Sequence, residues 1–189
     1  QAGAVIETAF AKGKVTNLHL EVLPAPTEPA AEESVVRRIF ATAPAGPIAD
    51  LLESAGVTVV PPQKPIAAED EDIVLTTGLG TETGAGRVVP AQSLAAALAA
   101  ISVNEPNNPD TGAVVAAMRD AARSMRVAYP SQETLASIIA TCRDLLADGG
   151  EQVTILSALD VDAQDLGQQL DVDVVALNVP DIATEIGVE

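Results

Sequence analysis

The chain has 189 residues, of which 48% are hydrophobic and 20% are charged. This composition excludes an intrinsically disordered protein, and because only 2% of the residues are aromatic, the core must consist of Ala, Val, Leu and Ile. The 27 acidic and 10 basic residues give a net charge of −17. Such a chain would repel a phosphate backbone and offers few rings on which bases could stack, which excludes nucleic-acid binding.

The cysteine count and the hydropathy pattern restrict the class of protein further. A single cysteine excludes a disulfide framework and a Cys-rich zinc site. No apolar run approaches the roughly 18 residues that a membrane span needs, and no signal peptide begins the chain, so we expect a cytoplasmic protein. The chain starts at Gln1 rather than Met, so we also expect a segment upstream of it.

The N-terminal segment predicts a helix, a strand and a linker. Apolar residues at helical spacing around Phe10 are followed by Gly13, and apolar and polar residues then alternate over 18–22, as in a half-buried strand. The proline-rich stretch that follows cannot continue a sheet or a helix. We therefore predict the end of a preceding domain over 1–24, a linker over 25–33 and the main domain over 34–189.

The first half of the main domain predicts four short strands and one helix. The predicted strands lie at 35–40, 57–60, 73–75 and 87–89, and the helix begins at Pro47 and ends at Gly56. Only residues 78–86 separate the last two strands, whereas a parallel crossover needs about a dozen residues. We therefore expect a hairpin or an irregular loop at that point.

The second half predicts four helices and two strands. The helices cover 94–101, 110–125, 135–146 and a segment that begins near Asp162, and the strands cover 152–156 and 172–177. Asp110 and Ser131 are the expected N-caps of the second and third helices. The segment 104–109, in which 107–109 breaks the helical pattern, divides the domain. The whole pattern predicts an α/β fold with a mixed, largely parallel sheet flanked by helices, in two lobes over 34–103 and 110–189.

Two residue types that often carry catalysis occur once each. His19 would have to serve any Ser-His-Asp or Cys-His arrangement, but it lies on the polar side of its strand, where a solvated histidine is the simpler interpretation. Cys142 lies within the apolar stripe of a predicted helix, away from cations and from any second cysteine, as a buried structural thiol does. No catalytic residue is predicted.

Two glycine-containing segments have features of anion sites. The stretch 78–86 is rich in glycine but matches neither GxGxxG nor GK[ST], and Glu82 would oppose a phosphate, so we interpret it as a flexible turn. The turn that contains Gly46 precedes a helix N-terminus and is a candidate anion contact, although Pro47 removes one donor.

Three acidic segments stand out. The spacing of the aspartates in 160–165 is similar to that of a calcium-binding EF-hand loop. That loop requires Gly and Glu where this chain has Asp165 and Asp171. Asp162 is better explained as a helix cap, and no metal site is predicted. The run 69–72 is expected to be a solvated loop. From 144 to 189 the chain has eleven acids and no Lys or Arg, a field that keeps a protein soluble or selects a basic partner.

Three segments, 88–93, 148–155 and 186–189, follow one another in an order and with motifs that resemble the fatty acid kinase A subunit, a dihydroxyacetone-kinase-like family that works with a DegV-like partner. Residues 88–93 resemble the family's strand that ends in Val-Pro-Thr-Arg/Lys-Ser/Thr, and residues 148–155 resemble its Gly-Gly-Glu-x-Val-Thr strand. Residues 186–189 are similar to its C-terminal Ile-Gly-Val-Glu. The helices at 94–101 and 114–125, and the segment 6–22, are similar to the family in the same order.

The resemblance implies the end of the family's middle domain and a shortened C-terminal domain, without the kinase domain. It therefore implies no enzymatic activity and no cofactor. It implies a partner-binding or regulatory module that docks a fatty-acid-carrying DegV-like protein, and the acidic C-terminal lobe predicts that this docking is salt-sensitive. The candidate contacts to a ligand or partner are Gly46, Pro90, Gln92 and Ser93.

Two other functions stay open. One is an enzyme domain related to dihydroxyacetone kinase that handles a small ligand or an acyl phosphate; it would need a histidine near a pocket, and His19 lies before the linker. The other is a dimerisation module that forms a homodimer, which the Ala-rich helix at 94–101 would support.

Overall fold

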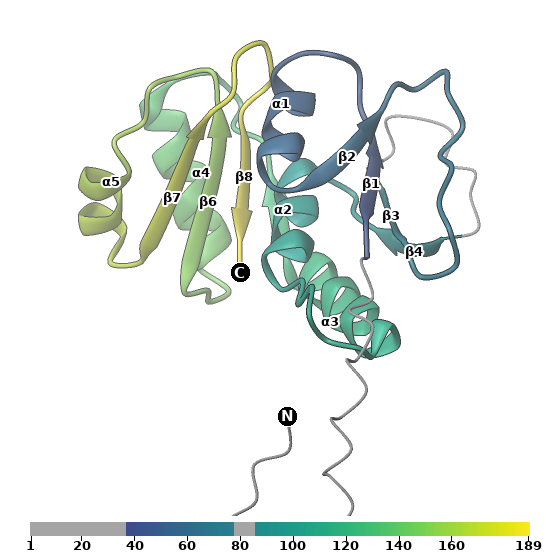
Figure 1. Cartoon of the computed structure of the whole chain (residues 1–189). Helices are drawn as coiled ribbons and strands as arrows, with labels where there is room; N and C mark the ends of the chain where they lie inside the picture. Colours follow the sequence, from purple (N-terminus) through teal and green to yellow (C-terminus); the bar gives the residue numbers. More distant parts are fainter. Residues whose placement is uncertain (1–36, 78–85) are drawn as a thin grey trace, which may run out of the picture. The chain divides into compact units, whose positions relative to one another are not determined.

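The computed structural model describes residues 37–77 and 86–189 (Figure 1), all of which belong to one compact unit that runs from Val35 to Glu189. These residues form an α/β fold with two four-stranded sheets and five helices, which confirms the predicted fold class. The predicted helix, strand and linker before residue 34 lie outside the described residues. No described helix has the length and apolarity to cross a membrane.

The first sheet is entirely parallel and has the order β2-β1-β3-β4. Its strands are β1 (Ile39–Thr42), β2 (Val57–Val60), β3 (Ile73–Thr76) and β4 (Arg87–Pro90), and helix α1 (Pro47–Ser54) connects β1 to β2. Val74 of β3 pairs with Val88 of β4 in a parallel register, so the hairpin alternative at this connection is wrong. A hairpin reverses the direction of the chain and can therefore join only antiparallel strands.

The two faces of the first sheet are covered differently. Side chains of β1, β2, β3 and β4 on one face form a cluster with residues of α1 and of two later helices, α2 (Leu94–Ser102) and α3 (Thr111–Ser124). On the other face Phe40 and Val74 pack against Ile66 of the connection between β2 and β3. An irregular segment therefore covers this face, whereas in most parallel sheets a helix covers it.

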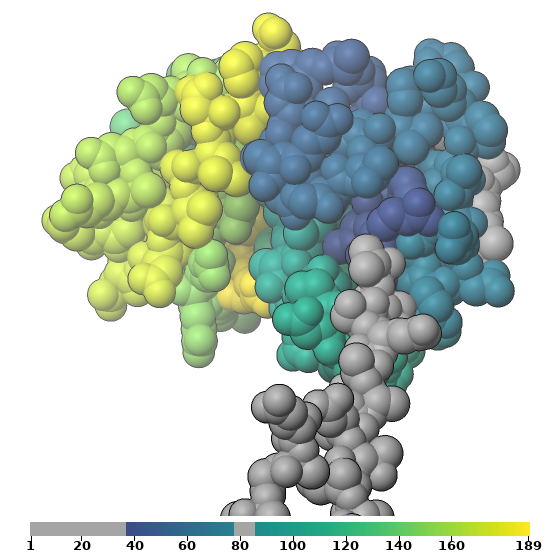
Figure 2. All heavy atoms as spheres, viewed as in Figure 1, coloured from purple at the N-terminus to yellow at the C-terminus, as the bar shows by residue number. Residues whose placement is uncertain are grey.

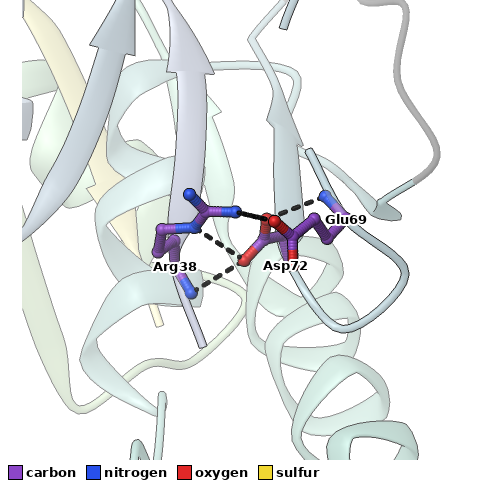
Figure 3. A network of polar contacts seen from close by, with 3 residues as sticks. All are labelled: Arg38, Glu69 and Asp72. Carbon is purple, nitrogen blue, oxygen red and sulfur yellow. Dashed lines mark hydrogen bonds and ion pairs between the residues drawn. The ribbon is translucent and has the colours of Figure 1, made fainter. Parts of the chain in front are cut away.

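That irregular segment is held by Asp72 (Figure 3). Asp72 is 3% exposed, and its carboxylate accepts hydrogen bonds from Nε and Nη2 of Arg38, at 3.1 and 2.6 Å, and from the backbone N–H of Glu69, at 2.8 Å. Burial by itself would raise the pKa of Asp72, but the hydrogen bonds from Arg38 and from the backbone outweigh it and hold the pKa below its usual value. The expectation that 69–72 is a solvated loop is thus wrong for Asp72, because a buried carboxylate needs such partners.

The second sheet is mixed and has the order β5-β8-β6-β7. Its strands are β5 (Arg126–Ala128), β6 (Gln152–Ser157), β7 (Asp173–Asn178) and β8 (Glu185–Val188). Helix α5 (Ala163–Leu170) joins the parallel pair β6 and β7, whereas β8 runs antiparallel to both β5 and β6. Helices α4 (Leu135–Leu146) and α5 share one apolar cluster with β6 and β8 on a single face of this sheet.

Two of the three predicted helix N-caps are confirmed, and the third is wrong. Oδ1 of Asp110 accepts from the N–H of Ala113, and Oδ1 of Asp162 accepts from two backbone N–H groups at the start of α5, so both predicted caps are confirmed. Helix α4 is capped by Thr134 rather than by Ser131. The hydroxyl of Ser131 instead lies 3.3 Å from that of Ser137, which is in the first turn of α4.

Helix α2 lies between the two sheets (Figure 1), and the space-filling view shows the blue first-sheet part directly against the yellow C-terminal part (Figure 2). This position explains the alanine-rich sequence of α2. Ala96, Ala97 and Ala100 belong to the cluster of the first sheet, and Ala95 belongs to a cluster with Leu156 of β6. A helix that is packed on two sides needs small side chains to bring both neighbours close.

The closest approach of α2 is to β8. The N–H of Ala95 donates to Oε1 of the buried Glu185 at 2.6 Å. Two residues further along β8, a Cβ atom added to Gly187 would lie 2.9 Å from Cβ of Ala95 and 2.6 Å from Sδ of Met125. Because no side chain fits there, the C-terminal strand must have glycine at 187.

We expect Glu185→Ala to lower the free energy of unfolding by about 1–3 kcal/mol, because it leaves a buried N–H of α2 without its acceptor. Glu189→Ala is the matched control, since Glu189 is exposed at the end of the same strand, and it should change the free energy by less than about 0.5 kcal/mol. Urea unfolding followed by circular dichroism measures both variants. Equal stability of the two variants would contradict the capping role of Glu185.

We expect Asp72→Asn to destabilise the fold by about 1–3 kcal/mol at pH 7, because the neutral amide cannot replace the charged acceptor of Arg38. The lowered pKa of Asp72 means that its contribution is present above the usual aspartate pKa of 3.8 and is lost as the pH falls through the lower, folded-state value. The difference from the wild type should therefore shrink in acid. Asp70→Asn, at an exposed neighbour, should leave the unfolding curve nearly unchanged at both pH values.

Candidate functional site

Three of the four predicted contact residues line one cleft. Pro90 is the last residue of β4, and Gln92 and Ser93 follow it immediately before α2. The cleft has a volume of about 440 Å³, and its other walls come from α2, from the end of α3 and from β5 and the residue after it. Those walls are formed by Ala96, Arg119, Ala122, Arg123, Met125, Val127 and Tyr129. Volumes of this size are typical of small-ligand sites.

The fourth predicted residue lies elsewhere. Gly46 is the N-cap of α1 and has a φ of 134°, a conformation that favours glycine. It does not line the cleft, so the structure separates it from Pro90, Gln92 and Ser93.

Two arginines supply the charge of the cleft. Nε and Nη2 of Arg119 donate to the backbone carbonyl of Val88 at 2.9 and 2.6 Å, and no described carboxylate forms an ion pair with Arg119. Nη1 of Arg123 donates to Asp120 at 2.8 Å, in an ion pair whose two side chains are each 74% exposed. Exposed pairs of this kind contribute little, so Arg123 is available to another anion.

Tyr129 supplies a hydroxyl and an apolar ring. Its side chain is the most exposed large hydrophobic group among the described residues, at 59%, and its Oη donates to Oε2 of Glu185 at 3.3 Å. Partial burial and the nearby carboxylate of Glu185 raise the pKa of Tyr129 above its usual value. The hydroxyl therefore stays protonated at neutral pH and acts as a hydrogen-bond donor rather than as a base.

The N-terminus of α2 borders the cleft but is already occupied. The N–H of Ala95 is bound by Glu185, and the N–H of Ala96 donates to Oγ of Ser93 at 3.1 Å. The chain thus places its own carboxylate where the helix dipole favours an anion. A phosphate could not use these amides without displacing Glu185.

A second depression is acidic. A groove of about 890 Å³ lies between the loop that precedes β6, helix α5 and the start of β7, and its charged lining residues are Glu151, Asp171 and Asp173. No basic residue lines it. Of the eleven acids between 144 and 189, only Glu185 is buried, and the other ten are exposed to solvent. The groove therefore lies in a surface of one charge sign.

The other candidate groups have structural explanations or lie outside the described residues. Cys142 is fully buried in the α4 face of the second sheet, and burial raises its pKa to about 11. Asp162 caps α5, as described above, and Asp165 accepts a hydrogen bond from Gln169 one turn later. Within 37–77 and 86–189, no three His, Cys, Asp or Glu residues are grouped so that they could hold a metal ion. His19 and most of the glycine-rich stretch 78–86 lie outside the described residues.

The sequence interpretation missed the residues that give the cleft its chemistry. Arg119 and Arg123 are four residues apart on α3 and therefore share one face of the helix, a signal that the sequence does contain. Tyr129 has no such signal. Its position depends on β5, a three-residue strand that pairs with β8 almost sixty residues later.

We expect Cys142 to resist thiol reagents in the folded protein, because a buried thiol with a raised pKa has almost no reactive thiolate at pH 7–8. A coloured disulfide reagent should react with less than one tenth of the protein in native buffer and with all of it in about 6 M guanidinium. Rapid native labelling would contradict the buried position of Cys142.

The comparisons with known proteins add no family assignment. A scan against protein-family models finds no match to this chain, and a search of the curated proteins finds no significant match either. The resemblance to the fatty acid kinase A subunit therefore stays a prediction from the order of short motifs.

Proposed function

We propose that the chain is a non-catalytic, partner-binding module of a fatty-acid-kinase-like protein and that it docks a lipid-carrying, DegV-like subunit. The acidic groove beside α5 carries the proposal, because its charged lining is Glu151, Asp171 and Asp173 without a single basic residue. A surface of one sign selects a partner of the opposite sign and excludes partners of the same sign. The motif order supplies the identity of the partner.

The position of the acidic residues supports binding rather than folding. Apart from the buried Glu185, the acids of 144–189 are exposed, and none of them forms an ion pair with a described basic residue. Exposed charges of one sign repel one another and destabilise a compact state. Although Asp162 caps α5, the concentration of charge as a whole works against the fold, whereas a basic partner would gain a faster and more selective association.

The dimerisation alternative loses its main argument. The alanines of α2 suggested a helix that packs against a second copy. Ala95, Ala96, Ala97, Ala99 and Ala100 are instead buried within the described part of the chain. The alanine-rich sequence has an intramolecular explanation, and it gives no support to a homodimer.

Surface plasmon resonance against a purified DegV-like fatty-acid-binding protein tests the proposal. We expect binding at low salt and an association rate that falls about tenfold or more between 20 and 300 mM NaCl, with a much smaller change in the dissociation rate. The triple variant Glu151→Gln, Asp171→Asn and Asp173→Asn should slow association by about tenfold at low salt.

A matched triple variant controls for total charge. Glu53→Gln, Asp70→Asn and Glu105→Gln also removes three exposed negative charges, but none of these residues lines the acidic groove. It should slow association less than about twofold. Equal effects of the two triple variants would contradict the groove as the docking site, and the absence of binding at low salt would contradict the assignment of the partner.

A further inference from the structure

We propose that the cleft at the start of α2 binds a small monocarboxylic acid with an apolar body. The cleft is the one formed by β4, α2, α3 and β5, and it shares no residue with the acidic groove. The inference is independent of partner docking, since the two sites have opposite charge and different walls.

The charge of the residues that line the cleft is opposite in sign to the net charge of the described chain. The described residues include 21 acids and eight basic residues, yet the only charged groups that line the cleft are Arg119 and Arg123. A domain with this excess of acid repels anions over most of its surface. A cleft whose two charged lining residues are both cationic is therefore a place in the described chain where a small anion can approach.

The guanidinium of Arg119 is oriented by the protein before any anion binds. Its two hydrogen bonds to the carbonyl of Val88 fix the plane of the guanidinium, but they do not neutralise its charge, because the acceptor is a neutral carbonyl. A guanidinium has five N–H donors, and the three that the Val88 carbonyl does not use, on Nη1 and Nη2, form an end that matches a carboxylate. Since its side chain is already ordered, binding loses little further conformational entropy.

The donors of the cleft favour a carboxylate over a phosphate. Phosphate sites commonly use a helix N-terminus, but the first amides of α2 are bound by Glu185 and Ser93. The donors that remain are the two arginines and the Gln92 amide, which line the same cleft, because the Tyr129 hydroxyl is already bound to Glu185. These suffice for the two oxygens and the single charge of a carboxylate, whereas a dianion would meet more repulsion from the acidic chain.

The rest of the wall is apolar and defines the body of the ligand. Ala96, Ala122, Met125 and Val127 line the cleft together with the ring of Tyr129. The thioether of Met125 and the exposed ring of Tyr129 suit an aromatic group. The volume of about 440 Å³ is enough for a compound with one ring and a short side chain.

Titration of the full chain with phenylacetate tests the proposal, with binding followed by amide chemical shifts. We expect saturable shifts at Ser93, Ala96 and Tyr129 and a Kd on the order of 1 mM, as is usual for so small a ligand. Phenylacetamide, the neutral isostere, should bind at least tenfold more weakly, and phenylphosphonate should not bind more tightly than phenylacetate.

Charge-removing variants locate the site. Arg119→Gln and, separately, Arg123→Gln should each raise the Kd for phenylacetate by about tenfold or more, and Arg119→Lys should weaken binding by a smaller factor because it retains the charge without the fork. Arg143→Gln, at an exposed arginine of α4 outside the cleft, should leave the Kd within about twofold. Arg123 has only an exposed ion pair, so its variant remains folded and informative even if Arg119→Gln destabilises the edge of β4.

Any one of four results would overturn the proposal. Three of them concern phenylacetate, its amide and the variants. These are the absence of saturable shifts in the cleft, equal affinity for phenylacetate and phenylacetamide, and equal weakening by Arg143→Gln and the two cleft variants. Tighter binding of phenylphosphonate than of phenylacetate would also overturn it, since the site would then be one for phosphate.

Discussion

The contact between α2 and β8 is the constraint on which the rest of the structure depends. Glu185 accepts a hydrogen bond from the N–H of Ala95 in the first turn of α2, and Gly187 lets the helix come so close that no Cβ atom fits between them. The alternation along β8 makes this possible, because Ile186 and Val188 point into the apolar cluster under α4 while Glu185 and Gly187 face α2. One four-residue strand therefore completes the second sheet and joins it to the helix that also covers the first.

The cleft is a consequence of that arrangement. Helix α2 follows directly after β4, and its N-terminus is held by β8, so Pro90, Gln92 and Ser93 are brought beside β5, the other neighbour of β8. Helix α3 packs against both α2 and β4 and carries Arg119 to the carbonyl of Val88. The edge of β4 is thus bound by an arginine and ends in proline, which protects it from pairing with another strand. The same arginine gives the cleft its charge.

Charge is divided between two parts of the surface. The exposed acids of 144–189 surround a groove without a basic residue, and two of the eight described basic residues line the cleft. Four of the other basic residues have evident structural partners, such as Asp72 for Arg38 and the carbonyls of Leu145 and Gly149 for Arg126. Net charge alone describes an acidic protein. Its distribution shows one groove whose charged lining is acidic and one cleft whose charged lining is two arginines.

The sequence by itself determined the local elements, because helix caps, glycine stops and apolar periodicity act within a few residues. Asp110 and Asp162 cap their helices as predicted, and the α/β class follows from the order of the elements. Only the tertiary structure decided the division of the strands into two sheets and the parallel pairing of β3 and β4. It also decided the burial of Asp72 and the position of Gln92, Arg119 and Tyr129 around one cleft. These features rest on contacts between segments far apart in the chain, and β5 and β8 are too short to show a periodicity before they pair. The sequence therefore contains every residue of the cleft, but it does not show that these residues lie close together.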